Sequence, residues 1–157
     1  MAHSFFNKIL ITLFISMLIS SQLAMAQSEE SETPLTFEEI STRQLMEAIS
    51  SWAGSWQSQL PDLYISHYVI YYKPPEFNSR DQWVENRRTR LIEPEYINLR
   101  LLDFELIEIS DSEATVRFTL IYERPGYSDQ TYKELVFQGA NGFWLIKEEN
   151  NLEAIVL

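Results

Sequence analysis

Residues 114–122, ATVRFTLIY, form the clearest β-strand pattern in the chain. Apolar side chains stand at every second position of this stretch: Ala114, Val116, Phe118, Leu120 and Tyr122. A period of two places them all on one face of a strand, because successive strand residues point to opposite faces. The pattern therefore predicts a strand whose apolar face packs against a core.

Further strands are expected on both sides of this stretch. Before it, Ile97, Leu99 and Leu101 alternate with polar residues, and the adjacent Leu101 and Leu102 shift the phase as a β-bulge would. After it, residues 131–138 continue the strand pattern, residues 139–142 (GANG) predict a turn, and residues 143–149 return as the hairpin partner. Four consecutive strands without intervening helices predict an antiparallel sheet.

Helical patterns precede the strands. Thr36 and Glu39 have the spacing of a capping box, which predicts a helix start at this point. Apolar residues then recur at intervals of four, three and four and predict one buried helix face: Leu45, Ile49, Trp52 and Trp56. The two tryptophans on this face are interpreted as core residues.

Two shorter helices are expected after the first. Pro61 is tolerated in a first helical turn, so a short helix is predicted from there through Tyr68. Ser79 and Gln82 offer a second capping box, which opens a third helix. Three helices followed by at least four strands predict an α+β fold rather than alternating βαβ units.

The N-terminal region is predicted to direct export. Lys8 precedes an apolar run, and Ala24-Met25-Ala26 supplies the small residues that signal peptidase requires, so residues 1–26 are interpreted as a signal peptide. Residues 27–35 are predicted to be a mobile acidic leader, and residues 36–157 the folded domain. A periplasmic or secreted protein with no stable membrane insertion after cleavage is therefore expected.

The chain is strongly acidic, with 12 Lys and Arg against 23 Asp and Glu and a net charge of −11. Cleavage after residue 26 would change this to −12, because the removed segment holds one lysine and no acidic residue. Such a surface repels phosphate backbones and anionic headgroups, which argues against nucleic acid or membrane surfaces as the main partner.

Residues with catalytic or metal-binding chemistry are sparse. The chain has no cysteine, and His67 is its only histidine after residue 26. This excludes a His/Cys metal cluster and a Cys–His pair in the predicted domain, and no phosphate-binding glycine loop is present. We therefore predict no metal and no cofactor, and we interpret His67 as a structural residue.

A ligand site is predicted from cationic and aromatic residues that should face the sheet. Arg87 lies one helical turn after Trp83, where an arginine is rarely buried without a partner. One interpretation pairs Arg87 with Glu149 or Asp103, or stacks it on Trp83; the other places its guanidinium in a pocket that receives a carboxylate. The predicted ligand-binding set is Tyr64, Tyr68, Trp83, Arg87, Tyr122 and Lys133. For Lys133, snorkelling at the sheet margin is the competing interpretation.

These residues also carry a family resemblance. The pattern resembles the nuclear transport factor 2-like domain attached to periplasmic L,D-transpeptidase and cell-shape L,D-carboxypeptidase proteins, over about residues 40–150. It rests on the spacing of Trp52, Trp56, Tyr64, Tyr68, Pro74-Pro75, Ser79-Arg80, Trp83, Arg87-Arg88, Arg90, Phe118, Tyr122, Tyr127, Asp129, Lys133, Trp144, Ile146 and Glu149. The resemblance implies a cone-shaped fold in which a curved antiparallel sheet wraps the first helix and encloses a pocket. Leu120 departs from the family pattern, which tends to have Gln there, and makes one pocket wall more apolar.

The function predicted from the resemblance is that of an exported, non-catalytic binding or assembly module of the cell envelope. A peptidoglycan fragment or an envelope enzyme is the expected partner. The rival hypothesis is an isomerase, dehydratase or cyclase that uses Tyr68, His67 or Asp62 as acid or base and Arg87 as electrophile. A third hypothesis is a structural homodimer that pairs through the open face of the sheet.

Overall fold

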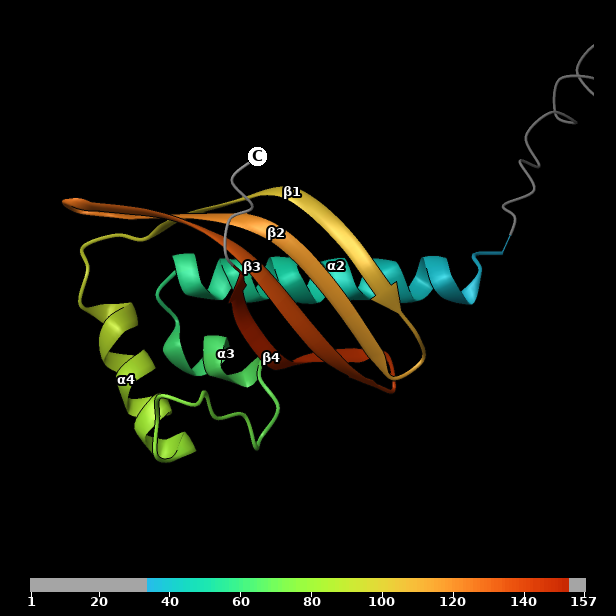
Figure 1. Ribbon diagram of the computed structural model, residues 1–157, viewed down its shortest axis with the longest axis horizontal. Helices are drawn as coiled ribbons and strands as arrows, with labels where there is room; N and C mark the ends of the chain where they lie inside the picture. The colour runs from blue at the N-terminus through green and yellow to red at the C-terminus, as the bar shows by residue number, and fades with distance from the viewer. Residues whose placement is uncertain (1–33, 153–157) are drawn as a thin grey trace, which may run out of the picture. The chain divides into compact units, whose positions relative to one another are not determined.

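The computed structural model describes residues 34–152 (Figure 1). The predicted signal peptide, residues 1–26, lies outside the described residues, as does most of the predicted leader, residues 27–35. No helix within residues 34–152 is long and apolar enough to span a bilayer.

The first described helix, α2, spans Phe37–Gln57 and begins at the predicted capping box. The Thr36 hydroxyl accepts a hydrogen bond from the Glu39 amide at 3.2 Å, and the Glu39 carboxylate accepts one from the Thr36 amide at 2.8 Å. The predicted face is confirmed for Leu45, Ile49 and Trp52, which are all buried. Trp56, the fourth member, is only partly buried.

Helix α3 spans Pro61–Ser66 and is shorter than predicted. The prediction that it runs through Tyr68 is wrong, because the backbone around Tyr68 pairs with a strand instead. The Val69 amide donates to the Ile146 carbonyl at 3.0 Å, and the Ile146 amide donates to the His67 carbonyl at 2.8 Å. This bridge occupies the outer edge of β4 at Ile146.

Helix α4 spans Arg80–Ile92. Its predicted capping box is half formed: the Ser79 hydroxyl accepts from the Gln82 amide at 3.2 Å, but the Gln82 side chain accepts from the Asn78 amide instead. Trp83, which was expected to face the sheet, is buried, and so is Leu91. Arg87 stands between them on the same face of the helix.

Four antiparallel strands form one sheet in the order β1-β2-β3-β4: β1 is Asn98–Ile109, β2 Glu113–Arg124, β3 Tyr127–Ala140 and β4 Phe143–Leu152. The predicted bulge in β1 is confirmed, since the pairing with β2 shifts between Leu102 and Glu105 and Asp103 has a φ of 53°. The predicted turn at residues 139–142 is tighter than expected. Only Asn141 and Gly142 form it, both with positive φ as a two-residue hairpin loop requires.

The core lies between α2 and one face of the sheet, which curves around this helix (Figure 1). Four of the five inward residues predicted from the alternation of β2 are fully or almost fully buried, namely Ala114, Val116, Phe118 and Leu120. The fifth, Tyr122, is partly buried. The described domain thus has the predicted α+β architecture, with three helices followed by an antiparallel sheet. Helix α4 and the ends of β2 and β3 leave room for a cavity at one end of this core.

Candidate functional site: a cationic cavity between α4 and the sheet

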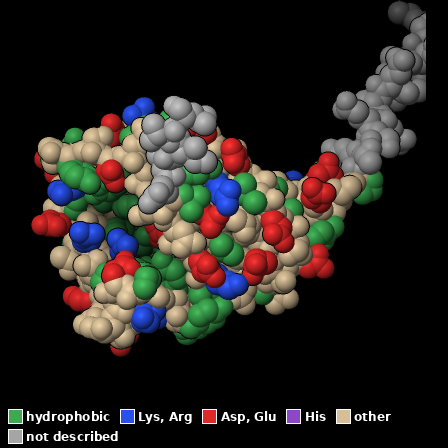
Figure 2. Space-filling view, viewed as in Figure 1, with side chains coloured by type: hydrophobic (Ala, Val, Ile, Leu, Met, Phe, Trp, Pro, Cys, Tyr) green, Lys and Arg blue, Asp and Glu red, His purple; other side chains and the backbone are tan. Residues whose placement is uncertain are grey.

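A cavity of about 460 Å³ opens at the end of the domain where α4 approaches β2, β3 and β4. Figure 2 shows Lys and Arg side chains around a hollow on the face that includes this end. The cavity is lined by Trp56, Arg87, Arg90, Leu91, Glu93, Pro94, Leu120, Tyr122, Arg124, Tyr127, Asp129, Thr131, Lys133, Glu149 and Asn151. A space of this size is typical of small-molecule sites.

The cavity has the opposite charge balance to the chain. Four of the chain's 12 basic residues line it, against three acidic residues, which gives a formal charge of +1 within a chain of −11. Lys133 and Glu149 neutralise each other, so the net positive charge comes from three arginines against two carboxylates, and a concave site with a net charge focuses the electrostatic potential. The cavity therefore favours an anionic ligand that the rest of the surface repels.

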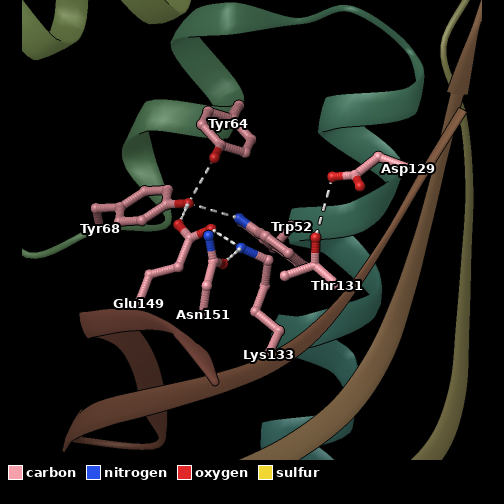
Figure 3. Close-up of polar contacts among 8 residues, drawn as sticks. All are labelled: Trp52, Tyr64, Tyr68, Asp129, Thr131, Lys133, Glu149 and Asn151. Atoms are coloured by element: carbon pink, nitrogen blue, oxygen red, sulfur yellow. Dashed lines mark hydrogen bonds and ion pairs between the residues drawn. The ribbon is translucent and has the colours of Figure 1, made fainter. Parts of the chain in front are cut away.

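The inner end of the cavity is formed by a buried ion pair (Figure 3). Lys133 on β3 is 6% exposed and donates to Glu149 Oε1 at 2.7 Å and to Asn151 Oδ1 at 2.8 Å, both on β4. The snorkelling interpretation of Lys133 is wrong, because Glu149 neutralises the ammonium inside the domain and Asn151 accepts a second hydrogen bond from it.

A chain of hydrogen bonds runs from Glu149 into the core (Figure 3). Tyr68 donates to Glu149 Oε2 at 2.8 Å and accepts from Trp52 Nε1 at 3.0 Å. The hydroxyls of Tyr64 and Tyr68 are 2.6 Å apart, and Tyr64 is the donor because the Tyr68 proton goes to Glu149. Burial raises the pKa of both phenols, with the negative charge of Glu149 adding to it, so both stay protonated.

Glu149 is held as a carboxylate. Burial by itself raises its pKa, but the charge and hydrogen bond of Lys133, the charge of Arg87 and the hydrogen bond from Tyr68 together bring that pKa below its usual value. Both carboxylate oxygens already accept hydrogen bonds. A carboxylate with a lowered pKa and two occupied oxygens is a weak general base.

The lowered pKa of Glu149 predicts a loss of stability in acid. The unfolded chain has a glutamate pKa of about 4.3, so the unfolded state binds more protons between that value and the lower folded pKa. The stabilisation is therefore complete above about pH 4.3 and is lost as the pH falls through the folded pKa. We expect the difference in unfolding free energy between wild type and Glu149→Gln, measured by urea at several pH values, to shrink in acid. A difference that stays constant from neutral pH down to about pH 3 would contradict this assignment.

Arg87 has no partner among the residues that the structure describes. Its Nε atom is buried without a hydrogen-bond partner, and its guanidinium forms no ion pair in residues 34–152. Glu149 is engaged by Lys133, and the cation over the Trp83 ring is Arg80, at 5.4 Å. Burial works against the charged form of Arg87, but the nearby tyrosines and Glu149 raise its pKa overall. The guanidinium is therefore charged and free to bind an anion.

The structure divides the predicted ligand-binding residues into two groups. Arg87, Tyr122 and Lys133 line the cavity. Tyr64, Tyr68 and Trp83 do not line it and are almost completely buried in the core behind it. Trp56, which was interpreted as core, is partly buried and contributes to the cavity wall.

Several cavity residues were not part of the predicted set: Arg90, Arg124, Tyr127, Asp129, Thr131, Glu149 and Asn151. A usable signal exists for two of them, because Asp129 and Thr131 have the same strand parity as Lys133 and so share its face. Polar residues on the inward face of a strand indicate a cavity rather than a closed core.

The candidate acids and bases of the enzyme hypothesis do not line this cavity. Asp62 is exposed and forms an ion pair with Arg88 at 2.9 Å. His67 caps the C-terminus of α3, and its Nε2 lies 3.3 Å from the Ser51 hydroxyl. Within residues 34–152, no cluster of three or more His, Asp or Glu side chains is arranged to hold a metal ion.

Three helices on a curved antiparallel sheet, with a polar cavity between the last helix and the sheet, define an NTF2-like α+β domain. The chain belongs to the family of Cds6 C-terminal NTF2-like domains, whose family model matches residues 44–150. No match was found among curated proteins.

Solved structures share the fold at low sequence identity. Bd1075 from Bdellovibrio bacteriovorus has a TM-score of 0.63 and 20% identity over 70% of this chain and 40% of that chain. The helical cell shape determining protein Pgp2 from Campylobacter jejuni, as a K307A mutant, has a TM-score of 0.62 and 15% identity over the same shares. A putative scytalone dehydratase from Novosphingobium aromaticivorans has a TM-score of 0.58 and 13% identity over 72% of this chain and 85% of that chain. The chain thus spans less than half the length of the first two structures.

Proposed function

We propose that this protein is an exported, non-catalytic binding module of the cell envelope whose cavity takes an anionic peptidoglycan fragment. Arg87 is the observation that carries the proposal. The charged Arg87 guanidinium lines the cavity, and its two terminal nitrogens form no hydrogen bond within residues 34–152, so they can bind a carboxylate through two parallel hydrogen bonds.

Charge and family context support this function. The cavity is cationic in a strongly acidic chain, so anion binding is specific to this surface. The family model and the similarity to a cell shape determining protein favour the envelope as the place of action. Peptidoglycan fragments carry the free carboxylates that such a site binds.

Binding is favoured over catalysis by the state of Glu149. It is the most buried carboxylate of the cavity, but Lys133 and Tyr68 occupy both of its oxygens. Proton abstraction from a substrate needs a base within hydrogen-bond reach and with a free oxygen. A dimer through the open face of the sheet stays a prediction.

Replacing Arg87 with leucine is expected to keep the fold and to abolish most of the ligand affinity. Leucine fits a half-buried helix position, and Arg87 has no described ion-pair partner that its removal would leave unpaired. Loss of a charge-assisted carboxylate contact should weaken binding by about 2–5 kcal/mol. Isothermal titration of a muropeptide with free carboxylates into the purified protein measures the affinity, and urea unfolding measures the stability.

Arg88→Leu is the matched control. Arg88 is the next residue on the same helix, is half exposed, and pairs with Asp62 outside the cavity. The Arg88→Leu variant should bind the muropeptide with the affinity of the wild-type protein. The proposal fails if the wild-type protein binds no carboxylate-bearing muropeptide, or if Arg87→Leu and Arg88→Leu bind it equally well. A muropeptide whose carboxylates are amidated should not bind the wild-type protein.

A further inference from the structure

An aromatic wall lines the cavity from α2 across to the turn between β2 and β3. Trp56 from α2 and Tyr122 from β2 have ring centroids 5.7 Å apart, and Tyr122 and Tyr127 have centroids 6.1 Å apart. Arg124 lies over the Tyr127 ring at 5.1 Å and also lines the cavity. Tyr127 is 48% exposed, so this wall ends at the mouth of the cavity.

A polar wall follows the inward side of β3 and β4. It consists of Asp129, Thr131, Glu149 and Asn151, all of which line the cavity. The Thr131 hydroxyl donates to Asp129 Oδ2 at 3.1 Å (Figure 3). Both Glu149 oxygens are occupied, but Asp129 Oδ1, the Thr131 oxygen and Asn151 Nδ2 form no other hydrogen bond within residues 34–152 and can bind hydroxyl groups of a ligand.

We infer that the cavity takes a pyranose sugar that carries a carboxylate, with the carboxylate at Arg87 and the ring against the adjoining aromatic and polar walls. This inference rests on the proposed function and narrows the part of the ligand that the cavity recognises. A pyranose has C–H faces that pack on aromatic rings and an edge of hydroxyls that needs hydrogen-bond partners. The two walls supply one of each.

Other anions fit these walls less well. An aliphatic or planar aromatic acid packs on the rings but leaves the polar wall without partners, which costs free energy on desolvation. A phosphate brings a second negative charge into a cavity with a formal charge of only +1, close to Glu93, Asp129 and Glu149. A singly charged carboxylate on a hydroxylated ring meets both requirements.

The test separates the ring from the carboxylate. Isothermal titration of the purified protein with lactate, N-acetylglucosamine, glucuronic acid and N-acetylmuramic acid presents the carboxylate alone, the ring alone and two sugar acids. At least one sugar acid should bind about tenfold or more tighter than lactate and than N-acetylglucosamine. Comparing the affinities of glucuronic acid and N-acetylmuramic acid shows whether the site prefers a carboxylate on the ring or on an ether side chain.

Tyr127→Thr tests the aromatic wall, because Tyr127 is exposed enough for its ring to be removed without opening the core. Threonine keeps the β-propensity of the position. We expect it to weaken sugar-acid binding about tenfold and to leave lactate binding unchanged. Tyr96→Thr is the control, since Tyr96 is similarly exposed, at 52%, and does not line the cavity.

The inference and the proposed function fail in different ways. If a free stem peptide binds through Arg87 at least as tightly as both sugar acids, and Tyr127→Thr does not weaken the binding of either sugar acid, the sugar subsite is overturned while the proposed function stands. If neither peptides nor sugar acids bind the wild-type protein, the proposed function itself is overturned.

Discussion

Trp52→Ala is expected to lower the free energy of unfolding by about 3–5 kcal/mol, a large part of the stability of a domain of this size. Trp52 is completely buried in the middle of α2. The centroid of its ring lies 5.5 Å from that of Trp56 and 6.3 Å from those of Tyr64 and Phe118. Alanine therefore leaves a cavity bordered by α2, α3 and the sheet.

The substitution also removes a buried hydrogen bond. Trp52 Nε1 donates to the Tyr68 hydroxyl, which in turn donates to Glu149. Loss of one donor leaves Tyr68 with fewer partners in a site that excludes water. The loss of stability should therefore be near the upper end of the range.

Urea unfolding of the wild type and the variant measures this loss. Phe37→Ala is the matched control, because Phe37 lies on the same helix but is 60% exposed. The control should change stability by less than about 1 kcal/mol. A Trp52→Ala effect as small as that of the control would show that the α2 face does not carry the core.

Lys133→Met is expected to lower the free energy of unfolding by about 3–5 kcal/mol, the second large effect. Lys133 and Glu149 are both nearly buried, with side chains 8% and 11% exposed. Removing the ammonium leaves Glu149 as an uncompensated charge inside the domain. The double variant Lys133→Met/Glu149→Leu should regain part of the loss, because two apolar side chains need no charge partner, although Tyr68 loses its hydrogen-bond acceptor.

Lys147→Met separates burial from ion pairing as such. Lys147 also forms an ion pair, with Glu113 at 2.8 Å, but both side chains are about a third or more exposed. Its loss should cost less than about 1 kcal/mol. Urea unfolding of the wild type and the three variants measures these differences in unfolding free energy. Equal losses of stability for Lys133→Met and Lys147→Met would contradict a special role of the buried Lys133–Glu149 pair.

The sequence by itself determined the type and order of the elements. The capping residues Thr36 and Ser79 mark the starts of α2 and α4, and the alternation in β2 gives its buried face. These features depend on residues three or four apart, or on a strand period of two, so local chemistry specifies them. The inner face of α4, with Arg87 between Trp83 and Leu91, was predictable for the same reason.

Only the tertiary structure decided which groups meet in the cavity. The pairing of β3 and β4 shifts between Val136 and Phe137. As a result Ile146 and Glu149, which are three residues apart, both face inward, Ile146 into the core and Glu149 into the cavity. Strict alternation from Ile146 would have turned Glu148 inward instead. Likewise, α3 ends early because residues around Tyr68 bond to β4, and Arg87 is left without a partner because Lys133 engages Glu149. Strand register and competition between distant side chains are set by packing across the whole domain, and local sequence patterns do not record them.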